Sequence, residues 1–515
     1  MTQTAALSWF RPIQHYQQLN MSFPKCASPL FELPQELLEI VLSYLPPSQD
    51  VLNLSRTCKA LHAKTIAHLY SYINMQWQAG HATRPLSIHD YHPWQRRAFW
   101  PNLLLQTILA KPAYAQSITS LRLQTTGLGG CWGEWFRDPR RREPLEKRKP
   151  KAAPTWTDAK QRLALNAVRN AGLEWHHKRR GDAFAVSGRS WYEAILMYDS
   201  DATIALLVWM CPNLVSLDLG FHIGSDVVYI PEILWKLRSC GAESQALGCR
   251  KLRNIHLGRG YSGYVKEDHR WYSWSRIKYL HQHLDWRGYW AFLWCPNIQK
   301  IEMSLMDEIA QAGFQKATPL PVCSTLTTLR LGESSVEPDT LAKLLSCTPA
   351  LRKLDYEYWV RDQAFFTVDC ASLSAALNSV KSTLEHLRFF CQLHSAGSVD
   401  VYGNCDFREY PVLSSLHVPP AVILGGEASL WPRIEEVIPS SLEELCFVHD
   451  GLLKFWSPKE LIPLLDDFFQ GGWRVKTPKL QRVYATHNKP WKKACRGNYL
   501  RLLSERNGLE WVNTS

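Results

Sequence analysis

The segment "GRGYSG", Gly258 to Gly263, has the G-x-G-x-x-G spacing of loops that bind the pyrophosphate of a dinucleotide. In such sites the glycines permit a tight turn and a close approach of the backbone to the phosphates, and an acid such as Asp285, about twenty residues on, binds the ribose. Here, however, the preceding strand pattern belongs to a repeat series, and polar "YVKEDHRW" follows where small apolar residues are needed. We therefore interpret the segment as a loop and expect no cofactor.

Positive charge is concentrated in one part of the chain. Residues 137–180 contain 14 Lys/Arg and 5 Asp/Glu, so 9 of the 12 net positive charges lie there. The densest part comprises Arg140, Arg141, Arg142, Lys147, Arg148, Lys149 and Lys151. This patch has the composition of a nuclear-import signal, of a surface that contacts an acidic partner or nucleic-acid phosphates, and of a solvated loop. All three interpretations stay open, but the even charge balance elsewhere does not favour a nucleic-acid-binding protein.

Aromatic residues gather between Arg270 and Asn297. Trp286, Trp290 and Trp294 are four residues apart, which is typical of one packed stripe of a helix. Trp271, Tyr272 and Trp274 lie nearer the loop and are our weak candidates for a substrate-binding surface.

Other chemical motifs are missing from the sequence. There is no G-x-S-x-G, P-loop or H-E-x-x-H motif, and the adjacent pair His176 and His177 would point about 100° apart on a helix. We therefore predict no catalytic residues and no metal ligands, and hence a protein that is not an enzyme.

The composition is that of a globular protein, with 46% hydrophobic and 21% charged residues. The 14 cysteines are scattered without a C-x-x-C pair, which favours free thiols in a reducing compartment. The N-terminal residues lack the apolar core of a signal peptide, and the longest apolar run, Ile204 to Cys211, is too short to cross a bilayer. We expect a protein of the cytoplasm, the nucleus or both, with no membrane partner.

A ladder of the form L-x-x-L-x-L recurs along most of the chain. Its ten copies begin at Ile118, Leu214, Leu252, Ile298, Leu326, Leu351, Leu384, Leu413, Leu442 and Leu480. Helical patterns such as Glu337–Cys347 and Ser457–Phe469 lie between copies, and a further helix is expected from Thr157 to a basic end at Lys178–Arg180. Short strands that alternate with helices in this way are typical of a leucine-rich-repeat solenoid.

The repeats are irregular in length. From Leu214 the intervals are 38, 46, 28, 25, 33, 29, 29 and 38 residues, and only four of the eight fall within the 20–29 usual for leucine-rich repeats. We therefore predict an α/β fold whose larger part is an irregular, leucine-rich-repeat-like solenoid, or horseshoe, with inserted loops.

The segment "LPQELLEIVLSYL", Leu33 to Leu45, has more apolar residues than one buried helix face needs. Pro34 suits a helix start, and Pro46-Pro47 ends the pattern. About forty residues of helical pattern are too few to bury both faces internally, so either the downstream domain or a second protein covers the surplus.

The region from Leu33 onward resembles an F-box. The resemblance rests on Leu33, Pro34, Leu37, Leu38, Ile40, Val41, Leu42, Leu45, Leu52, Leu54, Cys58 and Lys59. Leu61 stands where that family often has Trp, and "PPSQD" makes the connection a residue longer than in many members. The resemblance implies a three-helix module that docks onto the Skp adaptor of a cullin–RING ubiquitin ligase. The residues it implies for adaptor binding are Leu33, Pro34, Leu37, Leu38, Val41, Leu42, Leu45 and Leu52.

Together these patterns predict a flexible N-terminus (1–28), an F-box (29–75) and a solenoid (86–515) with a basic insertion (132–180). The resemblance implies the substrate-recognition subunit of an SCF-type ubiquitin ligase, whose repeats bind a protein substrate for ubiquitin-dependent degradation. The alternative is an interaction scaffold outside any ligase that uses the basic insertion.

Overall fold

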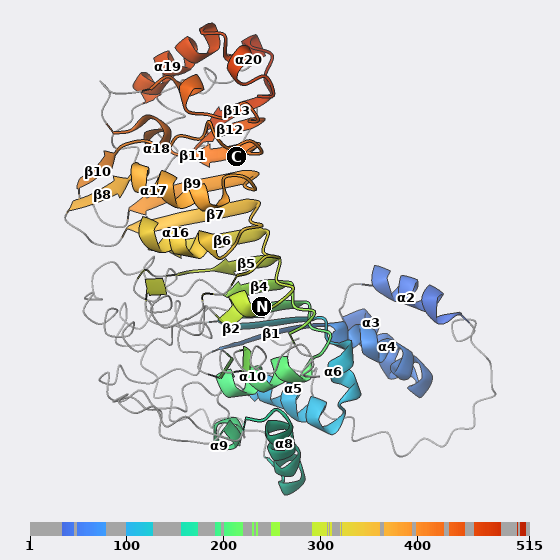
Figure 1. Ribbon diagram of the computed structural model, residues 1–515. Helices are drawn as coiled ribbons and strands as arrows, with labels where there is room; N and C mark the ends of the chain where they lie inside the picture. Colours follow the sequence, from blue (N-terminus) through green and yellow to red (C-terminus); the bar gives the residue numbers. More distant parts are fainter. Residues whose placement is uncertain are drawn as a thin grey trace, which may run out of the picture. The chain divides into compact units, whose positions relative to one another are not determined.

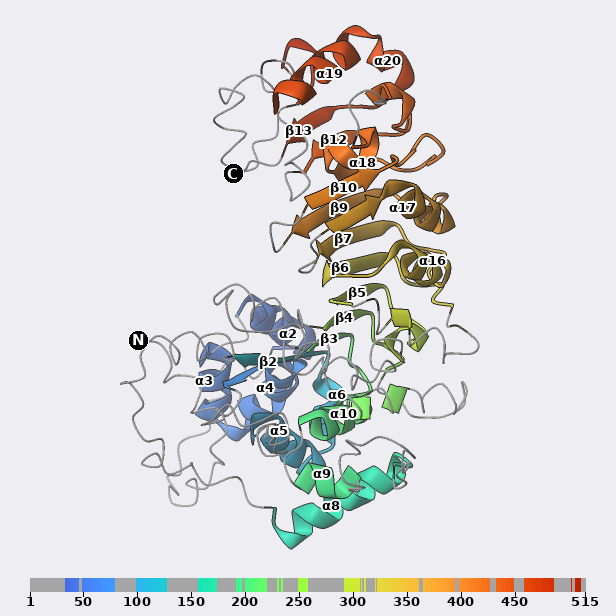
Figure 2. The same ribbon diagram turned by 90° about the vertical axis from the view of Figure 1, so that its left-hand side faces the viewer.

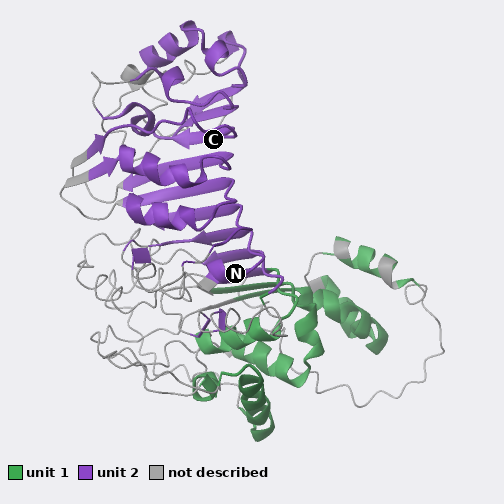
Figure 3. Cartoon of the chain, viewed as in Figure 1, with its two compact units in different colours: residues 1–127, 138–215, 245–249 green, residues 128–137, 216–244, 250–515 purple. Residues whose placement is uncertain are grey.

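The structure is a computed structural model of the 515-residue chain. It describes residues 33–45, 49–78, 99–126, 156–173, 191–196, 200–219, 249–257, 291–305, 322–360, 365–393, 398–426, 432–448, 458–485 and 505–510, and a few single positions between them. The chain divides into two compact units (Figure 3): unit 1 comprises residues 1–127, 138–215 and 245–249, and unit 2 the remainder. Among the described residues no helix is long and apolar enough to cross a membrane.

Unit 1 is mainly helical. Its elements are α2 (Gln35–Tyr44), α3 (Gln49–Thr57), α4 (Lys59–Ser71), β1 (Tyr72–Gln78), α5 (Phe99–Ala110), α6 (Ala113–Ser117), β2 (Ser120–Thr126), α8 (Asp158–Asn170), α9 (Trp191–Leu196) and α10 (Ser200–Met210). β1 and β2 pair in parallel, Tyr72 opposite Ser120. The buried side chain of Asn102 on α5 donates to Thr203 Oγ1 on α10 at 3.0 Å and to the carbonyl of Ile195 at 3.3 Å. These bonds fix three helices around one core.

The predicted helix after Thr157 is shorter than expected. Thr157 caps α8, as its Oγ1 accepts from the Lys160 N–H. The helix ends at Asn170 because Gly172 adopts a left-handed conformation with φ 64°. Gly172 N–H donates to Arg169 O and Leu173 N–H to Val168 O, which is the Schellman pattern that closes a helix. The predicted helix is therefore confirmed for Asp158–Asn170 and wrong for Ala171–Leu173, and its expected basic end at Lys178–Arg180 lies outside the described residues.

Unit 2 is built from the ladder repeats. Nine of its strands form one parallel sheet, in the order β3 (Ser216–Leu219), β4 (Asn254–Leu257), β5 (Lys300–Met303), β6 (Thr328–Ser334), β7 (Lys353–Val360), β9 (His386–Leu393), β11 (Ser415–Val418), β12 (Glu444–Phe447) and β13 (Arg482–Ala485) (Figure 1). β8 (Phe365–Asp369) and β10 (Ser398–Tyr402) pair with each other beside it. No sequence pattern predicted that second pair.

Helices lie between the strands along the chain. They are α16 (Pro338–Ser346), α17 (Cys370–Leu377), α18 (Pro420–Leu424), α19 (Pro458–Gln470), α20 (Trp473–Lys476) and the 3-10 turns η6 (Ala291–Trp294), η7 (Asn378–Val380) and η9 (Ile434–Glu436). Figure 2 shows α16 and α17 stacked on one side of the strands of unit 2. Strand and helix therefore alternate as an α/β solenoid does, which confirms the predicted fold class.

The apolar ladder residues are the core of unit 2. In β6, for example, Leu329 and Leu331 are completely buried, as is Leu326 just before the strand, whereas Thr328 and Arg330 are half-exposed. The same alternation recurs in β3, β4 and β11. Since side chains of a strand alternate between faces, the in-register leucines line one face of the sheet and the variable residues the other.

Asp369 illustrates how the repeat connections are stabilised. It is the N-cap of α17, where its carboxylate accepts from the Ser372 N–H at 2.9 Å and from Ser372 Oγ at 2.7 Å, and these bonds hold its pKa below the ordinary value. We expect Asp369→Ala to destabilise unit 2 by about 1 kcal/mol at neutral pH. Because the folded pKa is lowered, the stabilisation is present above the ordinary Asp pKa and is lost as the pH falls through the lowered one.

Denaturant unfolding of wild type and Asp369→Ala at several pH values measures this contribution. The free energies of unfolding of wild type and Asp369→Ala should differ at neutral pH and become equal in acid. A constant difference across the pH range would show that the charge of Asp369 is not the source of the effect.

Candidate functional site

Helices α2, α3 and α4 form a small module with its own core. Leu38, Leu42 and Val51 are at most 1% exposed, and Leu45, Leu54 and Leu69 pack against them. Leu38 and Leu42 are four residues apart and therefore lie on the same side of α2. The face of α2 that carries Leu38 and Leu42 is therefore buried within the module.

Local interactions set the ends of these helices. Pro34, with φ −50° and ψ 147°, stands immediately before α2, and Leu38 N–H donates to its carbonyl at 3.1 Å. Cys58 caps α4, since its Sγ accepts from the Leu61 N–H at 3.4 Å. Buried Thr65 donates its hydroxyl to the Leu61 carbonyl at 2.7 Å, so this polar side chain is satisfied inside the helix.

The opposite face of α2 is apolar and exposed. Leu37, Ile40, Val41 and Tyr44 are 48%, 52%, 42% and 83% exposed. Their spacing of i, i+3, i+4 and i+7 places them in one line along the helix, which we name the apolar stripe. Covering the exposed half of such a side chain is worth about 1 kcal/mol, so the stripe is a surface with several kcal/mol available for binding.

The structure separates the residues that the sequence had grouped together. Of the predicted adaptor-binding residues, Leu37 and Val41 lie in the apolar stripe and Pro34 is exposed beside it, while Leu33, Leu45 and Leu52 are half-buried. The side chains of Leu38 and Leu42 are not available at the surface, because they form the core of the module. Ile40 and Tyr44 were not among the predicted site residues, although the width of the apolar pattern already indicated them.

Three other predicted features lie outside the described residues. These are the basic patch (residues 140–142, 147–149 and 151), the aromatic candidates Trp271, Tyr272 and Trp274, and the "GRGYSG" segment. They stay predictions.

One cluster in unit 2 contains the residue types of an acyl-transfer site. His417 Nε2 lies 3.1 Å from Ser415 Oγ and 2.9 Å from Glu444 Oε1, and burial lowers the pKa of His417. In a Ser-His-acid triad the serine and the acid contact opposite nitrogens of the imidazole ring. Here both face the same nitrogen, so the arrangement is not that of a nucleophile, base and orienting acid. Within the described part of the chain no three His, Cys, Asp or Glu residues are grouped as metal ligands would be.

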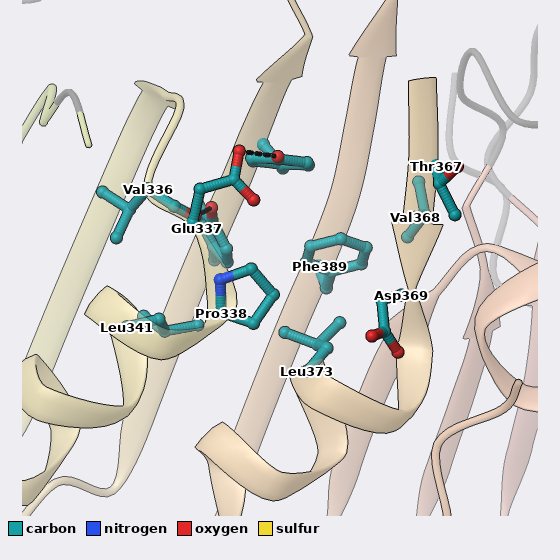
Figure 4. Close-up of a pocket in the computed structure, with 11 residues that line it drawn as sticks. Val336, Glu337, Pro338, Leu341, Thr367, Val368, Asp369, Leu373 and Phe389 are labelled. Carbon is teal, nitrogen blue, oxygen red and sulfur yellow. Dashed lines mark hydrogen bonds between the residues drawn. The ribbon is translucent and has the colours of Figure 1, made fainter. Parts of the chain in front are cut away.

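Figure 4 shows a pocket between α16, α17 and the neighbouring strands. Pro338, Leu341, Leu373 and Phe389 line it, and its cavity is about 50 Å³. That is room for a few water molecules, far below the roughly 300–1,000 Å³ of ligand sites. Its carboxylates have structural roles, because Asp369 caps α17 and Glu337 accepts from the Tyr358 hydroxyl at 3.2 Å. We therefore do not regard this pocket as a functional site.

Comparison with known proteins identifies the three-helix module. Residues 30–75 match the F-box-like family. They form an F-box-like domain. No curated protein matches the chain by sequence. Among solved structures, the leucine-rich repeat-containing protein LegL7 from Legionella pneumophila is similar over 59% of this chain and 87% of its own, with 11% identity and a TM-score of 0.26. The family match of residues 30–75 and the repeated strands of unit 2 together give an F-box-like domain joined to leucine-rich-repeat-like units, an architecture typical of non-catalytic adaptor proteins.

Proposed function

We propose that this protein is the substrate-recognition subunit of an SCF-type ubiquitin ligase. The observation that carries the proposal is the apolar stripe of α2, which the F-box-like domain leaves uncovered. F-box domains generally bind a Skp adaptor, and an exposed line of Leu, Ile, Val and Tyr on a helix suits a hydrophobic groove on such a partner. Pro34 and the half-buried Leu33 extend the same surface beyond the start of α2.

The repeats of unit 2 would bind the substrate. A parallel sheet presents its outward side chains at fixed spacing, and these positions vary without disturbing the leucine core. The contribution to ubiquitin transfer is then proximity, because holding a substrate lysine near the charged ubiquitin-conjugating enzyme raises its effective concentration. In this proposal the ubiquitin-conjugating enzyme carries out the chemistry.

Reconstitution with purified components tests the proposal. The full-length chain, a recombinant Skp adaptor and a cullin–RING subunit are mixed and separated by size-exclusion chromatography. We expect the chain to elute with both partners, and with the adaptor alone when the cullin is left out. Elution of a folded chain apart from the adaptor would refute the ligase function.

A further inference from the structure

The outward face of the sheet in unit 2 carries its charges in rows. Residues directly opposite in neighbouring strands form each row, because the strands are parallel and in register. Two rows cross the sheet side by side, one from β3 to β9 and the other from β4 to β9. The ion-pair row consists of Asp218, His256, Glu302, Arg330, Asp355 and Arg388, and the basic row of Asn254, Lys300, Thr328, Lys353 and His386.

The charged groups of the ion-pair row are paired with one another along the row. His256 Nδ1 lies 2.8 Å from Asp218 and its Nε2 3.7 Å from Glu302. Arg330 lies 3.0 Å from Glu302 and 3.5 Å from Asp355, which Arg388 also approaches to 3.7 Å. Acidic and basic groups therefore alternate along the row, and its carboxylates are already occupied by partners on adjacent strands.

The basic row is different. Lys300, Lys353 and His386 are exposed, and Asn254 and Thr328 are half-exposed. From β4 to β9 the row holds no carboxylate, and the ammonium groups of Lys300 and Lys353 have no ion-pair partner among the described residues. Beyond β9 the register leads through Ser415 of β11 to Glu444 of β12, whose carboxylate is paired with Arg482 at 3.1 Å. Every side chain of the row can donate a hydrogen bond. The uncompensated positive charge of this face therefore lies along one line.

Nearby charges do not cancel this line. Arg352, next to Lys353, is paired with Glu385 at 3.2 Å, so that acid is occupied. Glu357 is four residues further along β7, about 13 Å away, which exceeds the Debye length of about 8 Å at physiological salt. It also accepts a hydrogen bond from Gln392. The two nearest acids, Glu302 and Asp355, each two residues from a lysine of the row, are paired with Arg330. Lys300 and Lys353 are therefore the ammonium groups of this line without an ion-pair partner among the described residues.

We propose that the basic row is a docking surface for an acidic, extended segment of a protein. Lys300 and Lys353 are two strands apart, about 10 Å. Carboxylates at positions i and i+3 of a polyproline-II-like segment lie on one side about 9 Å apart, which matches this separation. Thr328 and His386 would donate hydrogen bonds to the backbone of the segment. Two spaced single charges fit the row better than one phosphate, which needs cations converging on a point.

Binding of an acidic segment does not depend on the proposed function. Only the identification of that segment as part of a ligase substrate rests on it. The test uses the full-length chain and three pools of fluorescent ten-residue peptides, randomised except for two fixed positions three residues apart. The fixed residues are both glutamate, both glutamine, or one phosphoserine with one glutamine. Fluorescence anisotropy reports binding at increasing salt.

We expect the glutamate pool to bind more tightly than the other two, and less tightly as salt rises. Lys300→Gln combined with Lys353→Gln should weaken binding about tenfold or more. The matched control changes two exposed lysines of unit 2 outside the row, Lys343→Gln and Lys476→Gln, and should bind like wild type.

Equal binding of the glutamate and glutamine pools, or unchanged binding by the Lys300/Lys353 variant, would overturn the inference. A preference for the phosphoserine pool would overturn the carboxylate specificity that it claims. Neither result bears on the apolar stripe, because capture of the Skp adaptor does not involve the peptide. Failure of this inference and failure of the proposed function are therefore separate observations.

Discussion

Replacing Ile40 and Tyr44 together with aspartate is expected to abolish capture of the Skp adaptor while the F-box-like domain stays folded. Both side chains are more than half exposed, so the change removes nothing from the core of the module. In the complex it removes two apolar anchors, each worth about 1–2 kcal/mol, and adds two carboxylates that would have to be desolvated. We expect the affinity to fall by about a hundredfold or more.

Capture of the full-length chain by immobilised adaptor measures this effect, with circular dichroism as the check on folding. The matched control is Leu163→Asp on α8, an apolar residue of unit 1 that is 39% exposed and lies outside the F-box-like domain. It should be captured like wild type. If the Ile40/Tyr44 variant is still captured at wild-type affinity, the stripe is not the adaptor-binding surface.

Truncation of Leu38 to alanine is expected to act through stability instead. This side chain is 1% exposed and packs with Leu42 and Val51. Leu→Ala at such a site leaves a cavity and costs about 2–5 kcal/mol, a large share of the stability of a module of three short helices. Leu38→Ala should therefore lose adaptor binding only in proportion to the fraction of the domain that is unfolded.

The neighbouring residue Leu37 supplies the control. It has the same side chain on the same helix but is 48% exposed, so Leu37→Ala should cost less than about 1 kcal/mol of stability. Hydrogen exchange of the amides in α3 and α4 measures domain opening in the full-length chain. Equal exchange rates in the two variants would show that Leu38 does not belong to the core described here.

The contrast between Leu37 and Leu38 shows where sequence reasoning stops. The composition of Leu33–Leu45 indicates that both faces of the helix are apolar, but it does not tell which face α3 and α4 cover. Which face is covered depends on how the three helices pack against one another. The apolar pattern of one helix carries no information about that packing. The predicted adaptor-binding set therefore contains buried Leu38 and Leu42 together with exposed Leu37 and Val41.

The solenoid was more predictable. Each ladder copy carries its own strand pattern, and repetition along the chain makes the parallel sheet predictable from local patterns such as Leu326, Leu329 and Leu331. The β8–β10 pair lacks such a repeat, and its register of Phe365 with Ser398 joins segments that no local pattern connects. Likewise, the basic row became visible only when register placed Lys300, Thr328 and Lys353 side by side.

Hydrogen exchange of α2 with and without the Skp adaptor tests the central claim most directly. The full-length chain is compared at saturating adaptor, with α16 of unit 2 as the internal reference. If the apolar stripe is the adaptor-binding surface, the amides of Gln35–Tyr44 should exchange markedly more slowly in the complex, while those of Pro338–Ser346 do not change. A complex that leaves exchange in α2 unaltered, or no complex from a folded chain, would contradict the account.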